Sequence, residues 1–432
     1  MNLLKSLLLG VYRAPGVLLV HFIEIWLRIK HLANPLTYSR VGRIVRLAPG
    51  RVRADGGRHV VFLTVQRDRL ASYTRRAIEA YARAGCNVTV VVNGAPSAAL
   101  IAALGPLAFQ ILVRKNIGRD FGGYKDGVLN LFDQQADGRI ELNRLILAND
   151  SMYYFERGLD AMVSWLLTSH ADFVGSNETN ELRYHIQSFL LSFSSDVIES
   201  QPFRSYWRRY LPIGTRRWAI HHGEAGISRT LVRAGFAPSV LFTTHALKDK
   251  LDRLEPADVF ERIQLMPIAF RRDLAHQEKE KWEQASKAAD SGFEAYTNWF
   301  AGLAAISGEK GPAARGASDA VEKYITLGDQ TLVNARRRER QASQAMSRFI
   351  IDRVQAGSQT HYGALLFMQE LQSPILKRDI AYRGIFHAYE ILDFLKSQGV
   401  DDLEEVAADL RVRGVSTWFR GLQRILYDGG II

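Results

Sequence analysis

Short apolar runs rich in β-branched residues alternate with stretches of helical periodicity along the middle of the chain, and this alternation limits the possible folds more than any other feature. His59–Val65 and Asn87–Val92 have the composition of buried strands, and Leu70–Ala84 between them carries apolar residues at helical spacing. Gly85 supplies the stop signal for that helix. Because strands joined by helical crossovers lie parallel, the sequence predicts an α/β fold with a mostly parallel sheet.

The same alternation continues and sets the expected limits of this domain at residues 59–270. Phe109–Val113 and Arg144–Ala148 are predicted as further strands, with a helix over Gly123–Gln135 between them. The later elements are expected to be a helix over 159–169, a short strand over 172–175, an extended run over 185–194 and a helix over 224–235.

Residues 1–58 are predicted to form a membrane-associating segment. Leu3–Ile29 is strongly apolar, but charged residues, a proline and a histidine interrupt it, so no clean stretch of about 20 apolar residues remains to span a bilayer. Six arginines follow between residues 40 and 58. We expect an amphipathic helix at a membrane surface, with Phe22 and Trp26 as anchors and the arginines near lipid phosphates. The alternative is a helix packed against the protein's own body.

Residues 271–432 are predicted to form a mainly helical, charged C-terminal extension. Ser307–Ser318 is its clearest linker. The run Arg336–Arg340 is interpreted as a solvated helix face in preference to a nucleic-acid patch.

The charge balance points to an anionic partner. The chain has 56 Lys and Arg against 45 Asp and Glu, a net charge of +11, which suits nucleic acid, a membrane surface or a phosphate-bearing substrate. It lacks the basic and aromatic patterns of single-strand binders and any recognisable helix-turn-helix or RNA module, so we expect no nucleic-acid partner. The single cysteine, Cys86, excludes an intramolecular disulfide and fits a reducing cytoplasmic compartment.

Ligands of open α/β sheets bind beyond the carboxyl ends of the strands, where one polar, glycine-rich segment is Asn116–Tyr124. Its glycines permit close approach of the backbone to a ligand, and the following helix N-terminus favours anionic groups. Arg119 suits a phosphate and Asp120 suits sugar or ribose hydroxyls. The alternative is a structural turn in which Asp120 caps the helix.

A second polar segment, Asn149-Asp150-Ser151, follows the apolar run Leu145–Ala148 of a predicted strand. The Asp150 carboxylate can hold Mg²⁺ or Mn²⁺, which would neutralise a diphosphate leaving group. The alternative is an ordinary turn. Further on, His185 and Gln187 are expected to share one face of a strand and to line a cleft, although a histidine there is also typical of a structurally satisfied polar residue.

Five segments of the α/β region occur in the order found in one known family. They are NIGRDFGGY at 116–124, LILANDS at 145–151, ADFVGSNE at 171–178, HIQSFLLSF at 185–193 and GEAGISRTLVRAGF at 223–236. On these segments the chain resembles the rhamnan synthesis protein F family of bacterial polysaccharide glycosyltransferases, which have a GT-A-like nucleotide-sugar-binding fold.

The resemblance implies an inverting transfer of a sugar, rhamnose or another deoxyhexose, from a nucleotide-sugar donor to a growing cell-surface polysaccharide or lipid-linked glycan. Asp150 looks like the acidic residue of the metal and diphosphate site, with the usual Asp-any-Asp pattern reduced to one aspartate. Glu224 looks like the carboxylate that takes the proton of the acceptor hydroxyl; the alternative is a helix N-terminal glutamate stabilised by the helix dipole. The implied donor-binding residues are Asn116, Gly118, Arg119, Asp120, Asn149 and Asp150.

Segment 358–384 is similar to two further elements of related transferases. Gln359-Thr360-His361 is similar to an Asn-Pro-Thr-His element, and Pro374–Asp379 is similar to a Pro-Phe-Ile-Lys-Arg element. This similarity implies that the segment completes the active site. The expected acceptor or cleft residues are therefore His185, Gln187, His222, His361, Lys377 and Arg378.

These expectations describe a cytoplasmic enzyme that is peripheral on the inner face of the cell membrane. The alternative is a non-catalytic component of a polysaccharide assembly complex that binds a nucleotide sugar or a glycan. The reduced acidic motif at Asp150 favours that alternative.

Overall fold

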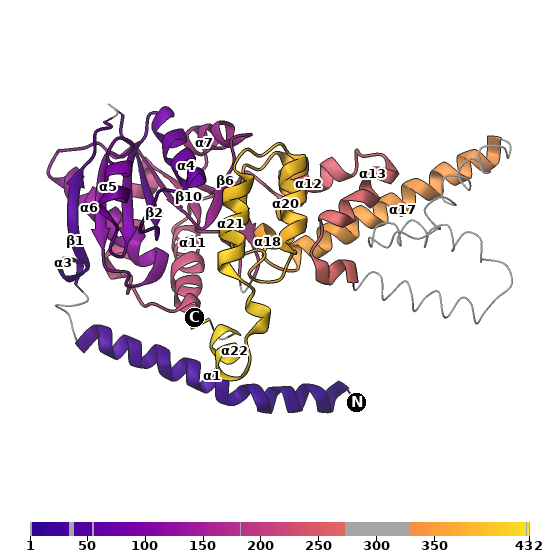
Figure 1. The fold of residues 1–432 in the computed structure, drawn as a ribbon, viewed down its shortest axis with the longest axis horizontal. Coiled ribbons are helices and arrows are strands. Elements are labelled where there is room, and N and C mark those ends of the chain that lie inside the picture. The colour runs from indigo at the N-terminus through magenta and orange to yellow at the C-terminus, as the bar shows by residue number, and fades with distance from the viewer. Residues whose placement is uncertain are drawn as a thin grey trace.

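An eight-stranded sheet forms the centre of the molecule, with strand order β1-β4-β3-β2-β5-β10-β7-β11 (Figure 1). The computed structural model describes residues 2–33, 39–53, 56–181, 183–272, 329–428 and 430–431. Residues 273–328 of the predicted helical extension, with the predicted linker Ser307–Ser318, lie outside the described residues. The strands are β1 (Ile44–Pro49), β2 (Arg58–Thr64), β3 (Asn87–Asn93), β4 (Gln110–Arg114), β5 (Arg144–Asn149), β7 (Phe173–Gly175), β10 (Leu190–Ser194) and β11 (Pro238–Val240).

Most neighbouring strands of this sheet are parallel. β2 pairs in parallel with both β3 and β5, β3 with β4, and β7 with β11, while β1 and β10 run antiparallel to their neighbours. The predicted α/β class and mostly parallel sheet are therefore confirmed. β1 lies in the sheet beside β4, so the sheet begins before residue 59, where the sequence suggested that the domain starts.

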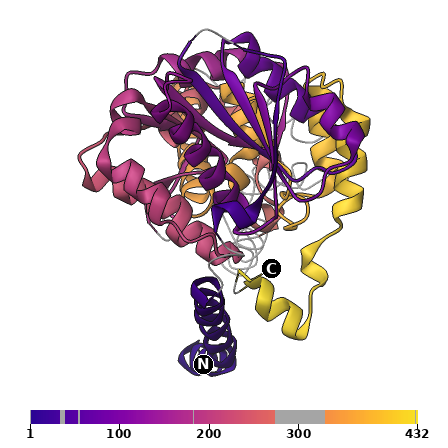
Figure 2. The same ribbon diagram turned by 90° about the vertical axis from the view of Figure 1, so that its left-hand side faces the viewer.

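Helices cover both faces of the sheet (Figure 2), which explains why the central strands β3, β4 and β5 are buried at every position. On β2, Val60 and Phe62 belong to one core, while Val61 and Leu63 belong to the other. The first core is covered by α4 (Ser72–Arg83), α5 (Ala98–Leu104), α7 (Leu159–Thr168) and α17 (Asp329–Gln355); the second is covered by α6 (Arg119–Ala136), α9 (Gln201–Arg209) and α11 (Ala225–Arg233).

The extended run expected over 185–194 is two strands. β9 (His185–Ile186) pairs with β8 (Glu178–Thr179), and β10 follows after a turn. The helix expected over 224–235 begins earlier than predicted, because a π-helix, Ala219–Glu224, leads directly into α11. Short elements complete this part: α3 (Arg40–Arg43), α8 (Ser195–Glu199), α10 (Arg216–Trp218), α12 (Thr244–Leu251), α13 (Pro256–Glu261) and the 3₁₀ turn Arg262–Leu265.

The C-terminal extension returns to the sheet edge through a second, two-stranded sheet. β12 (Ile375–Lys377) pairs antiparallel with β6 (Met152–Tyr154), which directly follows the end of β5. Around this pair a third apolar core joins the α/β body to the C-terminal helices. Those helices are α18 (Gln359–Tyr362), α19 (Ala364–Leu371), α20 (Ala388–Ser397), α21 (Leu403–Arg413) and α22 (Gly421–Asp428), with a 3₁₀ turn at Ser416–Trp418.

The expected N-terminal helix is α1 (Asn2–Ala33), which lies along one side of the body and contacts α22 (Figure 1). Val20 and Glu24 on one face are buried, and Leu27 packs against the second core. The opposite face leaves large apolar side chains in solvent. One face of α1 therefore packs on the protein's own body, and the other face is exposed. Among the described residues, no helix has an apolar stretch of the length needed to cross a bilayer.

Arg40 and Arg43, two of the arginines expected near lipid phosphates, instead pair with carboxylates of α6. Arg43 is buried, and its guanidinium donates to Asp126 of α6 at 2.5 and 3.0 Å. Arg114, at the end of β4, donates to the same carboxylate at 2.8 Å. Arg40 pairs with Asp133. These contacts anchor the start of the sheet to α6.

Candidate active site

The carboxyl ends of β2 and β5 meet at one edge of the sheet and fix the side chain of Asp150 there. Its Oδ2 atom accepts hydrogen bonds from the Thr64 hydroxyl at 2.6 Å and from the Val65 backbone N–H at 3.1 Å. Its own backbone N–H donates to the Leu63 carbonyl at 3.0 Å. The end of β2 therefore orients the carboxylate that follows β5, its neighbour in the sheet. Thr64 occupies a strand end, the same signal that drew attention to Asp150, and the sequence reasoning missed it.

Asp120, in the first turn of α6, lies beside the end of β5. The Asn149 side-chain amide donates to Asp120 Oδ2 at 3.4 Å, and the Asn149 Oδ1 atom accepts from the Ser151 hydroxyl at 2.5 Å. Burial raises the pKa of Asp120, and the nearby charges of Asp150 and Glu224 raise it further, while Arg119 and Lys377 oppose them. The polar segments predicted separately around Asp120 and Asp150 therefore form one site.

The glycines of segment 116–124 pack against the protein itself, which differs from the ligand approach expected for them. Gly118 begins α6 with φ of +80°, and a Cβ atom there would lie 2.3 Å from the Pro212 ring. Because Gly118 is the N-cap, Asp120 is not the capping residue, and its carboxylate belongs to the sheet-edge site instead. Arg119 and Asn116 are exposed.

Glu224 is the last residue of the π-helix, and this helix packs directly on the start of α6. A Cβ atom at Gly223 would lie 2.5 Å from the Phe121 ring, so glycine permits that close approach. Glu224 Oε2 lies 3.4 Å from His185 Nε2. π-helical turns inside longer helices are frequent at functional sites, because the extra residue re-aims a side chain.

His185 and Glu224 form a charged pair. The His185 Nδ1 atom donates to the Arg183 carbonyl at 2.8 Å, so Nε2 carries a proton toward Glu224 only in the imidazolium form. Burial lowers the pKa of His185, but the hydrogen bond and charge of Glu224 outweigh it, and the net shift is upward. For Glu224, burial raises the pKa, while His185 and Lys377 lower it to a net value below the ordinary one. Glu224 is therefore ionised at neutral pH.

Lys377 ends β12 and Arg378 follows it, and both lie against the same sheet edge. The Lys377 ammonium group donates to the Ser151 hydroxyl at 3.2 Å and lies over the Phe189 ring. The Arg378 guanidinium donates to the backbone carbonyl of Asp150 at 2.7 Å and forms two hydrogen bonds with Asp409. Lys377 thus brings a positive charge to the site, whereas Arg378 clamps its backbone.

Gln187 and His361 lie next to the site but are engaged in structural contacts. The Gln187 side-chain amide donates to the Ser358 hydroxyl at 2.9 Å, and the same hydroxyl contacts His361 Nδ1 at 2.8 Å. His361 Nε2 lies 3.0 Å from Asp379 Oδ1. These buried contacts attach segment 358–384 to the α/β body beside the site.

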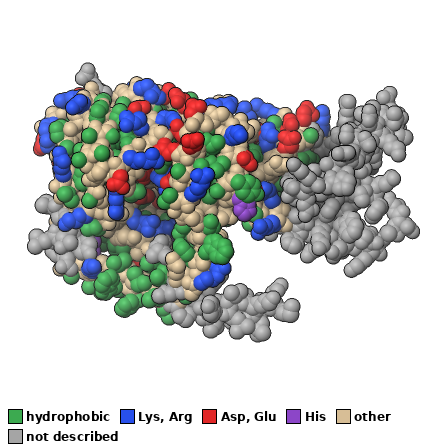
Figure 3. All heavy atoms as spheres, in the orientation of Figure 1, with side chains coloured by type: hydrophobic (Ala, Val, Ile, Leu, Met, Phe, Trp, Pro, Cys, Tyr) green, Lys and Arg blue, Asp and Glu red, His purple; other side chains and the backbone are tan. Residues whose placement is uncertain are grey.

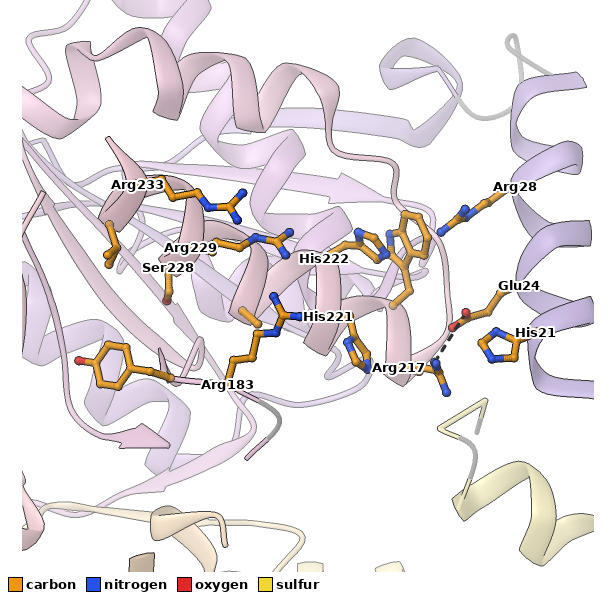
Figure 4. A pocket seen from close by; sticks show the side chains of 14 residues that line it. His21, Glu24, Arg28, Arg183, Arg217, His221, His222, Ser228, Arg229 and Arg233 are labelled. Carbon is orange, nitrogen blue, oxygen red and sulfur yellow. Dashed lines mark ion pairs between the residues drawn. The ribbon is translucent and has the colours of Figure 1, made fainter. Parts of the chain in front are cut away.

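His222 lies away from this cluster, although it precedes Glu224 by only two residues. Its ring stacks on Trp218, with the ring centroids 3.7 Å apart, and it lines a cavity of about 830 Å³ between α1 and the π-helix (Figure 4). Asp120, Asp150 and Glu224 do not line this cavity. The sequence does not predict this cavity, because its walls come from segments far apart in the chain.

The donor set at the sheet edge is compatible in kind with a hard divalent cation. Asp120, Asn149 and Asp150 offer carboxylate and amide oxygens, the ligands that Mg²⁺ and Mn²⁺ prefer. Within the described residues, no three His, Cys, Asp or Glu side chains form a group able to hold a metal ion by themselves. Mg²⁺ is usually bound through one or two carboxylates together with substrate phosphates, so these residues fit a cation that shares its coordination with a diphosphate.

Residues 88–284 match the family model of rhamnan synthesis protein F. All five segments that carried the resemblance fall inside this range, so the resemblance is confirmed there, while segment 358–384 lies outside it. The match supports a glycosyltransferase in general and specifies neither the donor sugar nor the acceptor.

Two further similarities extend over longer parts of the chain. An uncharacterized protein of Sinorhizobium fredii is 25% identical over 232 residues, which cover 52% of this chain and 59% of that relative. The matched region therefore spans less than two thirds of the relative's length. A solved structure of a mannosyltransferase from Pyrobaculum calidifontis, in complex with GDP-Man and Mn²⁺, covers 76% of this chain and 99% of its own, with 13% identity and a TM-score of 0.26.

Proposed function

We propose that this protein is an inverting glycosyltransferase that uses a nucleotide-sugar donor. The observation that carries the proposal is the position of Glu224, an ionised carboxylate held by His185 beside the cluster of Asp120, Asp150 and Lys377. This cluster lies at the carboxyl edge of the sheet, where α/β folds bind ligands. A carboxylate with a depressed pKa is unprotonated at neutral pH, as a general base must be.

In the proposed reaction, Glu224 accepts the proton of an acceptor hydroxyl while the hydroxyl oxygen bonds to the anomeric carbon of the sugar. The bond between that carbon and the diphosphate oxygen breaks, and the nucleoside diphosphate leaves with the electron pair. Lys377 and the exposed Arg119 are placed to stabilise the negative charge that develops on the leaving group. A divalent cation held by Asp120 and Asp150 would neutralise further diphosphate charge when bound.

The match specifies neither the sugar nor the acceptor, so both rest on the description of the matching family. That description, rhamnan synthesis, supports rhamnose or a related deoxyhexose as the proposed sugar and a growing polysaccharide or lipid-linked glycan as the proposed acceptor. We include these identities in the proposal as the first donors and acceptors to test.

Attachment to the membrane surface is part of the proposal, and the exposed face of α1 supports it. Leu18, Phe22, Ile25, Ile29 and Leu32 are each more than half exposed and recur every three or four residues, which places them on one stripe of the helix. Figure 3 shows hydrophobic side chains gathered along this side of the molecule. An apolar stripe with basic residues nearby is typical of helices that lie in the membrane interface.

The test begins with donor binding. We expect one nucleotide sugar of a panel, with dTDP- and GDP-linked deoxyhexoses included, to raise the melting temperature of the purified protein, measured with and without Mg²⁺ or Mn²⁺. Glu224→Gln should keep that binding and lose transfer by about 100-fold or more, because only the proton acceptor is removed. Glu199→Gln, an exposed glutamate on α8, is the matched control and should behave as wild type.

Each result decides between the two functions. Donor binding by wild type without any transfer would support the non-catalytic binding component, and full transfer by Glu224→Gln would remove Glu224 from the mechanism.

A further inference from the structure

The cavity between α1 and the π-helix is lined by an unusual concentration of arginines. Arg28 comes from α1, Arg183 from the loop before β9, Arg217 from α10, and Arg229 and Arg233 from α11. Figure 4 shows these side chains around the same space, about 830 Å³ in volume. Among the described residues that line it, Glu24 alone carries a carboxylate.

Most of this positive charge is not balanced by the protein. Arg217 lies 3.8 Å from Glu24. Within the described part of the chain, Arg183, Arg229 and Arg233 form no ion pair with a carboxylate. Five guanidinium groups around one cavity repel each other unless an anion joins them, so their gathering points to an anionic ligand.

The two histidines of the cavity wall respond to the same charge. Burial lowers the pKa of His221, and Arg217 and Arg183 lower it further. Burial also lowers the pKa of His222, followed by Arg28. Both imidazoles are therefore neutral at pH 7, and the cavity's charge comes from its arginines, whose planar guanidinium groups match phosphate oxygens.

The cavity shares a wall with the candidate active site. His221 and His222 line it from the π-helix, and the same helix ends at Glu224. Arg183 lines the cavity with its side chain, while its backbone carbonyl holds His185 of the Glu224 pair. A helix is about 10 Å across, so a ligand bound among the arginines could reach around it to the candidate base.

The other wall of the cavity is α1, which also carries the exposed apolar stripe. Arg28 and Glu24 face the cavity, while Phe22 and Ile29 lie in solvent. One helix thus presents charge to the cavity and an apolar surface to whatever covers its outer face. A ligand with a phosphate head and an apolar chain satisfies both surfaces together.

We propose that this cavity binds the phosphate or diphosphate head of a lipid whose apolar chain lies along α1, and that the lipid presents its glycan to Glu224. The role as an acceptor site depends on the glycosyl transfer proposed above. Binding of the lipid head does not depend on it.

The first experiment uses the full wild-type chain and three probes. Farnesyl diphosphate, which joins an apolar chain to a diphosphate, should bind about 10-fold or more tightly than inorganic pyrophosphate, and farnesol should bind least. Equal binding of farnesyl diphosphate and pyrophosphate would show a site for free anions and overturn the lipid proposal. Equal binding of farnesol and farnesyl diphosphate would show that the arginines play no part.

The second experiment locates the site. The double variant Arg229→Gln with Arg233→Gln changes two exposed side chains and should weaken farnesyl diphosphate binding about 10-fold or more. The matched control, Arg157→Gln with Arg253→Gln, removes the same charge from exposed positions outside the cavity and should bind as wild type. Equal affinities for the two double variants would overturn the assignment.

Nucleotide-sugar binding, measured on the same preparations, separates the two proposals. If no nucleotide sugar binds while farnesyl diphosphate binds through the arginines, the proposed transfer fails and the lipid-head site stands. If a nucleotide sugar binds and farnesyl diphosphate does not, the lipid-head site fails alone.

Discussion

The two sides of one π-helix, Ala219–Glu224, carry opposite charge and different neighbours. On the sheet side, Glu224 and Asp150 both act on the pKa of Asp120, and the charge of Lys377 lowers the pKa of Glu224. On the α1 side, arginines surround a cavity that lacks any of these carboxylates. The carboxylates of the candidate site and the arginines of the cavity therefore lie on opposite sides of the same helix.

This separation has a consequence for the chemistry of Glu224. Against the effect of burial, its pKa is lowered by the hydrogen bond and charge of His185 and then by Lys377. Among the described residues, no arginine of the cavity forms an ion pair with Glu224. A direct arginine partner would lower the basicity of a carboxylate and occupy its oxygens. Holding the arginines behind the π-helix leaves Glu224 ionised and able to accept a proton. A general base and an anion-binding site can thus lie next to each other when a helix separates them.

The largest expected effect comes from removing a charge on the acidic side. Asp150→Asn should reduce transfer by about 100-fold or more, because it removes the negative charge at the proposed diphosphate position. The amide oxygen of the asparagine can still accept the hydrogen bond from the Thr64 hydroxyl. Steady-state kinetics at saturating acceptor measures the loss. Asp401→Asn, at an exposed position, is the matched control. Turnover of Asp150→Asn at the wild-type rate would show that the Asp150 carboxylate, on the sheet side of the π-helix, has no role in transfer.

A second prediction concerns the clamp beneath Asp150. Asp409 accepts hydrogen bonds from Arg378, Arg413 and Tyr153, and its pKa is lowered to about 2 against burial, chiefly by the hydrogen bond from Arg378. Asp409→Asn should reduce the free energy of unfolding by about 2–3 kcal/mol at pH 7.

The pH dependence of that loss has a definite sign. A carboxylate with a depressed folded pKa stabilises the fold above its ordinary pKa, and this contribution is lost as the pH falls through about 2. The difference between wild type and Asp409→Asn should therefore shrink between pH 5 and pH 2 in urea unfolding. A difference that stays constant over this range would show that the ionised carboxylate is not what holds Arg378.

A smaller effect is expected at the charged pair. His185 lowers the pKa of Glu224, so His185→Asn should raise this pKa and move the acid limb of the kcat/KM profile to higher pH. Below that limb the variant loses activity at a pH where wild type is still active. His245→Asn, an exposed histidine on α12, serves as the control. An acid limb that does not move would show that His185 does not set the protonation of Glu224.

The last and smallest effect concerns the outer face of α1 and is measured as binding to vesicles. Phe22→Ser with Ile29→Ser should weaken binding to anionic vesicles about 10-fold and leave the melting temperature unchanged, because both side chains are exposed. Val20→Ser on the buried face should lower the melting temperature instead. If the exposed pair lowers the melting temperature and vesicle binding is unaffected, the stripe is part of the protein's own packing.

The sequence predicted the sheet and part of the site because both follow local rules. Each of β2, β3, β4 and β5 is built around a short apolar run, and Asp150 follows the last of them, where parallel strands collect ligand-binding residues.

Other features depend on contacts that no local pattern records. The arginines at 28, 183 and 217 come together only because α1 packs against α10, and nothing in their spacing predicts this. The burial of Arg43 depends on Asp126, 83 positions later in the chain. Lys377 reaches Ser151 only through the pairing of β12 with β6. Its role was inferred from a motif similarity, and the structure supplies the contact that the motif did not describe.

The most direct test of the account compares two variants in one transfer assay with a lipid-diphosphate acceptor. We expect Glu224→Gln to lower kcat about 100-fold or more with little change in the acceptor KM, because it removes only proton transfer. The variant Arg229→Gln with Arg233→Gln should raise the acceptor KM about 10-fold and leave kcat and donor binding near wild type. This result would show that the two sides of the π-helix have separate functions, proton transfer on the Glu224 side and acceptor binding on the arginine side. Equal losses of kcat in both variants, with unchanged acceptor KM, would contradict it.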